Sequence, residues 1–118
     1  MDLKILVVED EVRISHLLRM YLERESFLVD VVDNGDDGLD KAVKENYDCI
    51  ILDVLMPGKD GYQVLEELRK SKHTPVIMLS AKYTEEDQKH GTDLGASAFI
   101  SKPFSPAAVV MKVKELLT

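Results

Sequence analysis

Cysteine is almost absent from this sequence, because Cys49 is the only one in 118 residues. A single cysteine excludes an intramolecular disulfide framework and fits a reducing compartment. No apolar run approaches the roughly 18 residues that a membrane-spanning helix needs. The first residues also lack the basic segment of a secretory signal peptide. We therefore expect a cytoplasmic protein that does not cross a membrane.

Basic residues are scarce as well, with 15 Lys and Arg against 22 Asp and Glu and a net charge of −7. A domain this acidic is not expected to bind nucleic acid through its overall charge. Hydrophobic residues at 45% and charged residues at 31% are typical of a globular domain. The length predicts one domain over residues 1–118, either free-standing or cut from a longer protein.

Familiar phosphate and nucleophile motifs are missing too. The sequence has no G-x-x-x-x-G-K-S/T loop, no G-x-G-x-x-G after the first apolar run, and no G-x-S-x-G turn. The three histidines lack metal-ligand spacing and are expected at the surface. Cys49 lies inside an apolar run, so we expect a packed core residue rather than a reactive thiol.

What the sequence does contain is a regular alternation of short apolar runs and amphipathic segments. The runs cover residues 5–8, 49–52, 76–79 and 98–100, and a weaker run at 27–32 contains Asp30. Short runs rich in β-branched residues predict strands that are covered on both faces. The charge of Asp30 predicts that the weaker strand lies at an edge of the sheet.

Segments with helical periodicity follow each run, at 14–22, 39–43, 64–68, 84–94 and 109–117. The fourth is the least apolar, so we expect it to be the most loosely packed helix. Asn34, Asp60 and Thr84 are each followed three residues later by an acid or amide, as in a capping box. Ser105 before Pro106 predicts a capped helix start. The order predicts an α/β domain with a parallel sheet and helices on both faces.

Polar residues lie just past the ends of four of these runs. Glu9, Asp10 and Glu11 follow the run at 5–8, and Asp53 follows the run at 49–52. Ser80 follows the run at 76–79, and Lys102 follows the run at 98–100. Ligands of open α/β sheets bind beyond the carboxyl ends of the strands, so we expect these side chains to converge there. Each has a common alternative, such as Asp10 capping a helix or Lys102 lying on the surface.

Together, however, the acids need a neutralising partner, because crowded carboxylates raise one another's pKa values. Mg²⁺ with a nearby ammonium group would supply that partner, with Asp10 and Glu9 holding the metal. The set fits phosphoryl transfer to a carboxylate nucleophile. Asp53 is the best nucleophile, because its strand is expected at the centre of the sheet. Ser80 and Lys102 would then contact phosphoryl oxygens.

Four segments resemble the response-regulator receiver domains of two-component signalling: Lys4–Glu11, Asp53–Gly61, Pro75–Ala81 and Phe99–Phe104. Their order and separations make the resemblance specific, and it extends over about Lys4–Leu117. It implies a flavodoxin-like, doubly wound, five-stranded parallel sheet with strand order 2-1-3-4-5 and five helices.

The resemblance also implies roles for single residues. Asp53 matches the phosphoacceptor, which receives its phosphoryl group from a histidine kinase or phosphotransfer protein. Glu9 and Asp10 match the acidic pair around Mg²⁺, which Asp53 and the backbone carbonyl of Leu55 also join.

Lys102 matches the lysine that contacts the phosphoryl group, and the resemblance implies a cis bond to Pro103. Ser80 and Phe99 match the switch pair, in which the hydroxyl moves toward the phosphoryl group and the ring turns inward. The expected function is a phosphorylation-dependent signalling switch that changes the surface of its fourth helix, fifth strand and fifth helix. Such a switch catalyses only its own aspartyl phosphorylation and dephosphorylation.

The implied output is a downstream protein or a fused effector domain, with no direct contact to nucleic acid or membrane. A phosphorylation-dependent homodimer is allowed, although Ser97 and Ala98 replace the acids typical of the winged-helix transcription-factor branch. Rival interpretations are a receiver-like binding module that takes no phosphate, a small aspartyl-phosphate phosphatase and a flavodoxin-type cofactor carrier. The phosphatase would need a second acid where Leu55 stands, and Glu9–Glu11 would repel a flavin phosphate.

Overall fold

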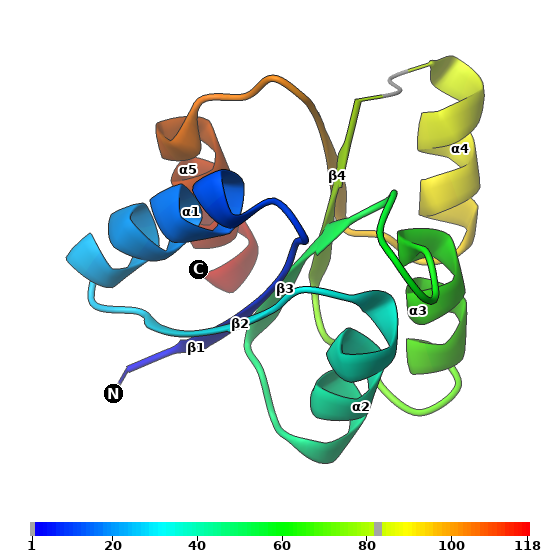
Figure 1. Cartoon of the computed structure of the whole chain (residues 1–118), viewed down its shortest axis with the longest axis horizontal. Coiled ribbons are helices and arrows are strands. Elements are labelled where there is room, and N and C mark those ends of the chain that lie inside the picture. Colours follow the sequence, from blue (N-terminus) through cyan, green and yellow to red (C-terminus); the bar gives the residue numbers. More distant parts are fainter. Residues whose placement is uncertain (1, 82–83) are drawn as a thin grey trace.

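The computed structural model describes residues 2–81 and 84–118, in which five strands alternate with five helices (Figure 1). The elements are β1 Lys4–Val8, α1 Val12–Arg24, β2 Leu28–Val32, α2 Gly35–Lys44, β3 Cys49–Asp53, α3 Gly61–Leu68, β4 Val76–Ser80, α4 Glu85–Asp93, β5 Ala98–Ser101 and α5 Pro106–Leu117. The predicted alternation is confirmed, and each strand lies within a residue or two of its apolar run.

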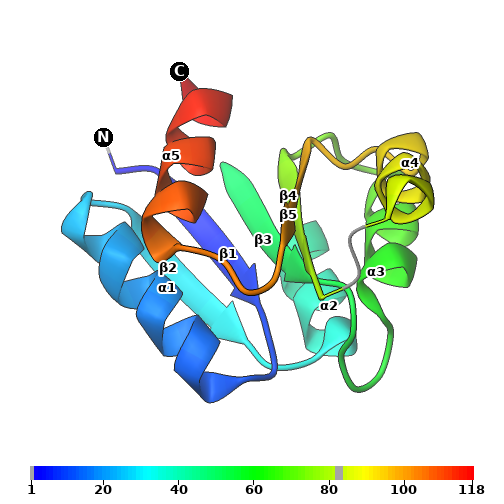
Figure 2. The same ribbon diagram turned by 90° about the horizontal axis from the view of Figure 1, so that it is seen from above.

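The five strands form one parallel sheet in the order β2-β1-β3-β4-β5. Helices α1 and α5 cover one face, and α2, α3 and α4 cover the other (Figures 1 and 2). The predicted doubly wound fold is therefore confirmed. β3 lies at the centre, and β2 lies at an edge, as its charged residue predicted.

Each strand supplies side chains to two apolar layers, because successive residues point to opposite faces of the sheet. Ile5 and Val7 of β1 pack with α1 and α5, whereas Leu6 and Val8 pack with α2 and α3. Every residue of β3 and β4 is buried. Burial on both faces explains why these strands read as unbroken apolar runs rather than as alternating patterns.

Helix starts follow the sequence signals with one exception. Asp60 and Gln63 form a full capping box, and the side chains of Asn34 and Thr84 each accept a backbone hydrogen bond from the residue three positions on. Ser105 does precede Pro106 at the start of α5, but its side chain makes no capping hydrogen bond. The predicted cap at Ser105 is thus wrong as a hydrogen bond, although the helix begins where expected.

The acid of the edge strand is held in a network of charges. Tyr47 donates a hydrogen bond of 2.6 Å to Asp30, and the ammonium groups of Lys4 and Lys41 lie 3.6 and 3.7 Å from the same carboxylate. The Tyr47 hydrogen bond, helped by the two lysines, holds the pKa of Asp30 below its usual value. A charge in an edge strand is therefore stabilised here by its neighbours rather than by solvent alone.

Helix α4 is the least anchored, as predicted. Among the residues that the structure describes it buries only Gly91, which faces the ring of Phe99 in β5. His90 of the same helix stacks edge-on against Tyr62 of α3, with ring centroids 4.5 Å apart. His16, His73 and His90 are exposed, as expected. Within the described residues, no helix is long and apolar enough to span a membrane.

We predict that Cys49 is inert in the folded protein. Its side chain is fully buried, and burial raises the pKa of its thiol to about 12, so little thiolate forms at neutral pH. Labelling with a thiol reagent should be more than about 100-fold slower in the native protein than in denaturant. Equal labelling rates in the two conditions would contradict this packing.

Candidate functional site

The polar residues predicted to converge do meet at the carboxyl edge of the sheet. Glu9 follows β1, Asp53 ends β3, Ser80 ends β4 and Lys102 follows β5. Parallel pairing of β1 with β3, of β3 with β4 and of β4 with β5 brings these strand ends together. The backbone N–H of Lys102 donates to the carbonyl of Ser80 at 2.7 Å, which fixes the start of the segment after β5.

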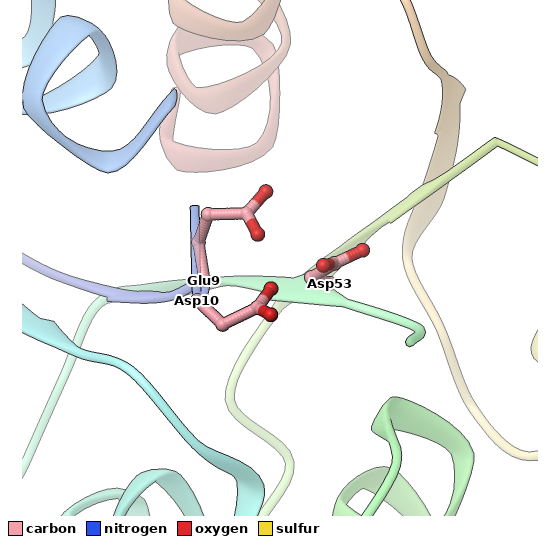
Figure 3. A group of neighbouring side chains, drawn as sticks. All are labelled: Glu9, Asp10 and Asp53. Atoms are coloured by element: carbon pink, nitrogen blue, oxygen red, sulfur yellow. The ribbon is translucent and has the colours of Figure 1, made fainter. Parts of the chain in front are cut away.

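Three carboxylates form the centre of the site. Oxygen atoms of Glu9, Asp10 and Asp53 all lie within 4.8 Å of one another, and Figure 3 shows the three groups facing one space. Glu9 is 1% exposed and Asp53 4% exposed, whereas Asp10 is open to solvent. Glu11, not Asp10, occupies the N-cap of α1, so the alternative role of Asp10 as a helix cap is wrong.

Lys102 provides positive charge to this cluster. Its Nζ lies 2.8 Å from Oε1 of Glu9 and 3.2 Å from Oδ1 of Asp53. Burial alone would lower the pKa of Lys102, but the adjacent carboxylates of Glu9 and Asp53 together raise it. The lysine is therefore held protonated between two buried acids.

One lysine does not neutralise three acids, and the uncompensated negative charge affects the pKa of Glu9. Burial and the nearby carboxylate of Asp53 raise the pKa of Glu9 to about 7, against a smaller lowering effect of Lys102. Within the described residues Oε1 of Glu9 accepts no hydrogen bond of good geometry, although the Lys102 ammonium lies beside it. A buried carboxylate oxygen in this state fits a site that is completed by another cation.

The chemistry of the donor set fits a hard divalent cation. Carboxylate oxygens of Glu9, Asp10 and Asp53 are the ligand type that Mg²⁺ prefers, and one or two carboxylates with several waters suffice for it. The open position of Asp10 leaves room for those waters.

Asp10 and Asp53 border a hollow of about 180 Å³. Its lining residues are Asp10, Glu11, Asp53, Leu55, Ser80, Ala81 and Lys102. The structure therefore brings Leu55 and Ser80 to the same space as the acids. Ser80 is 2% exposed, and 58% of Leu55 is exposed at the rim. Ala81 was given no role from the sequence, although it ends the segment Pro75–Ala81 that carries part of the resemblance.

Phe99 lies apart from this hollow. It pairs with Met78 within the sheet, and its ring packs near Gly91 of α4, where an added Cβ would lie 3.3 Å from it. The expected switch aromatic is thus placed against the loosely anchored helix rather than beside the acids.

A second hollow of about 410 Å³ adjoins the first and shares Glu11, Ala81 and Lys102 with it. Ile14 of α1 and Phe104 after β5 also line it. Sequence reasoning placed Ile14 only on the apolar face of a helix and gave Phe104 no role beyond the segment Phe99–Phe104, because the adjacency of α1 to the segment before α5 is a tertiary feature.

We compared the chain with protein-family models and with curated proteins. The family model described as "Response regulator receiver domain" matches residues 5–114. The chain is 51% identical over 116 residues to the transcriptional regulatory protein ResD of Bacillus subtilis, covering 98% of this chain and 48% of that protein. It is 50% identical over 117 residues to SrrA of Staphylococcus aureus, covering 99% and 48%. The chain thus spans about half the length of these curated relatives.

Solved structures show the same similarity. The receiver domain of the Francisella response regulator 1452 superposes with a TM-score of 0.94 at 32% identity, covering 98% of this chain and 97% of that one. The chemotaxis protein CheY4 of Vibrio cholerae superposes with a TM-score of 0.92 at 29% identity, covering 99% and 100%.

We predict a specific pH dependence for the metal-free protein. The pKa of Glu9 is higher in the folded than in the unfolded chain, so its contribution to stability is full below about pH 4.5 and is lost as the pH rises through about 7. Relative to Glu9→Gln, the wild type should lose on the order of 1–3 kcal/mol of unfolding free energy between pH 5 and pH 8 in chelator. Urea unfolding at each pH measures this.

Glu66→Gln, which changes an exposed acid of α3, is the control and should run parallel to the wild type. Parallel curves for Glu9→Gln as well would show that the folded protein does not favour the protonated form of Glu9.

We also predict that Mg²⁺ stabilises the fold, because only the folded chain assembles the three acids. At a Mg²⁺ concentration ten times Kd, the gain should be about 1.4 kcal/mol, seen as a rise of several degrees in Tm. Asp10→Asn should remove most of the rise, whereas Asp40→Asn, which removes an equal charge from the exposed side of α2, should keep it. A Tm that Mg²⁺ leaves unmoved in the wild type would contradict the metal site.

Proposed function

This chain belongs to the response regulator receiver domains, whose general function is phosphorylation-dependent two-component signalling, and we propose that it accepts its phosphoryl group on Asp53. The observation that carries the proposal is the position of Asp53 at the end of the central strand. There its carboxylate lies 3.2 Å from the Lys102 ammonium and within the acid cluster.

In the proposed reaction an Asp53 oxygen attacks the phosphorus of a phosphohistidine on a partner kinase or phosphotransfer protein. A P–O bond forms, the P–N bond breaks, and its electron pair stays with the imidazole of the donor. Asp53 is 4% exposed and lines the hollow, from which the phosphoryl donor would approach it. Lys102 pairs with one phosphoryl oxygen, and the hydroxyl of Ser80 donates to another.

Glu9, Asp10, Asp53 and the backbone carbonyl of Leu55 would hold Mg²⁺ at this site. When bound, the ion supplies positive charge to the oxygens of the phosphoryl group during transfer. The chain's own contribution is the fixed placement of these oxygens and of Lys102 on the ends of rigid strands. On this basis the domain catalyses only its own aspartyl phosphorylation and dephosphorylation, and acts on no external substrate.

The proposed switch is a shift between two populations. Phosphorylation adds about −1.5 to −2 charge and strong acceptor oxygens, which favour the arrangement in which Ser80 and Lys102 reach Asp53. Ser80 ends the strand that pairs with β5, and Phe99 of β5 packs near Gly91 of α4. Movement at Ser80 therefore has a short path to β5 and α4. On α5, the third element of the proposed surface, Met111 is 63% exposed.

We infer the partners from the same comparisons. A histidine kinase or phosphotransfer protein would supply the phosphoryl group. The relatives named transcriptional regulatory proteins are about twice as long as this chain, so an effector domain joined to this one, or a separate target, would carry the output. The net charge of −7 favours an output in which this domain does not itself touch DNA. The setting of such a pathway is the cytoplasm, where a phosphorylation-dependent homodimer is a further state.

Two rival functions are disfavoured by particular residues. A binding module that takes no phosphate has no need for Glu9, Asp53 and Lys102 to meet within ion-pair distance, as they do here. A phosphatase acting on external substrates would need an acid in the place of Leu55, whose side chain lies at the rim of the hollow.

We predict that the protein phosphorylates itself on Asp53 when it is incubated with Mg²⁺ and acetyl phosphate. In this reaction the P–O bond to acetate breaks as the aspartyl P–O bond forms. Intact mass should rise by one phosphoryl group in the wild type and in Asp40→Asn, and should not change in Asp53→Asn. Absence of the added mass in the wild type would favour the binding module, and continued release of phosphate over many turnovers would favour the phosphatase.

A further inference from the structure

The segment between β3 and α3 lies directly on the first turn of α2. The backbone N–H of Gly35 donates to the carbonyl of Pro57 at 3.3 Å. Lys59 Nζ lies 3.8 Å from a carboxylate oxygen of Asp36. Gly58, with φ of +78°, faces the side chain of Asp36 so closely that a Cβ on it would lie 2.3 Å from that carboxylate. We call residues 54–60 the β3–α3 loop.

Gly35 is the closest point of this contact. A Cβ at position 35 would lie 1.7 Å from the carbonyl oxygen of Lys59 and 2.7 Å from its carbonyl carbon. Both atoms belong to the backbone, so no side-chain rotation relieves the overlap. A side chain at position 35 would force the loop and the helix apart by more than about 1 Å, because packed interiors hold no spare volume of that size.

The loop is fixed at its other end as well. The N–H of Val54 donates to Leu79 of β4 at 2.9 Å, and the carbonyl of Val54 accepts from Gly61 at 2.8 Å. Between this anchor and the contact of Pro57 with Gly35 lie only Leu55 and Met56. The direction of the Leu55 carbonyl therefore depends on both anchors, one on the sheet and one on α2.

We propose that Gly35 is a positioning residue for the metal site, acting through the β3–α3 loop on the carbonyl of Leu55. This inference rests on the proposed function, in which that carbonyl joins Glu9, Asp10 and Asp53 around Mg²⁺. Gly35 touches neither the metal nor the phosphoryl group. Because glycine has no side chain, the backbone of the β3–α3 loop can contact α2 directly at Gly35. This contact places Leu55 at the rim of the hollow.

The decisive variant is Gly35→Ala, with Ala42→Gly as its matched control. Ala42 is a buried residue of the same helix, and glycine there weakens α2 by about 1 kcal/mol without touching the loop. Calorimetric titration well below the Tm of both variants gives Kd for Mg²⁺. Gly35→Ala should weaken binding roughly 10-fold, a typical effect of disturbing the support of a ligand, while Ala42→Gly should stay within about 2-fold of the wild type.

Two further readouts separate positioning from loss of stability. In acetyl phosphate reactions Gly35→Ala should need more Mg²⁺ for half-maximal rate yet approach the wild-type rate at saturation. In metal-free protein, amide hydrogen exchange across residues 54–61 should be faster in Gly35→Ala than in Ala42→Gly. If Gly35→Ala does not fold, Gly58→Ala disturbs the same contact from the loop side and carries the same expectations.

Equal Mg²⁺ affinities for Gly35→Ala and the wild type would overturn the inference. A wild type that binds no Mg²⁺ would instead overturn the metal site of the proposed function, and the hydrogen-exchange comparison would still test the support of the loop by Gly35.

Discussion

The mutual repulsion of three carboxylates around one lysine is the constraint on which this molecule depends. Glu9 and Asp53 are buried at neighbouring strand ends, and Lys102 reaches both of them. Burial strengthens the repulsion between the acids and their attraction to the lysine, because both act in a low dielectric. The packing of the sheet therefore holds the carboxylates together despite their mutual repulsion. A bound cation or phosphoryl group changes the electrostatic energy of this buried site more than it would change that of an exposed one.

The sheet withstands this repulsion because its apolar packing is continuous on both faces. β3 and β4 are buried along their whole lengths, so the strand ends that present Asp53 and Ser80 cannot drift apart without opening both layers. Edge strands carry the more tolerant features, such as Asp30 with its lysine and tyrosine partners. Burial is thus greatest at the central strands, where Asp53 stands, and least at α4, which buries only Gly91 among its described residues.

The fold and the acid cluster could be predicted from the sequence because both follow from local patterns: apolar runs mark the strands, and parallel strands must end at one edge. Features that depend on tertiary distance could not be predicted. Gly35 reads as an ordinary glycine at a helix start, and only the structure shows the Lys59 backbone against it. Ser105 has a capping sequence yet makes no cap, and the distances from Lys102 to Glu9 and Asp53 come only from the structure.

The contact between Gly91 and Phe99 has a consequence for how members of such a family diverge. The Phe99 ring lies so close to α4 that a methyl group at Gly91 would crowd it. The acids Glu9, Asp10 and Asp53 form a separate cluster at the carboxyl ends of β1 and β3. Sequence change at that helical position would alter what a binding partner meets without adding or removing any group of the acid cluster. The residues of the phosphoacceptor site and those of the partner-binding surface can therefore change separately. After gene duplication, one copy could acquire a new downstream target and still accept its phosphoryl group from the same donor.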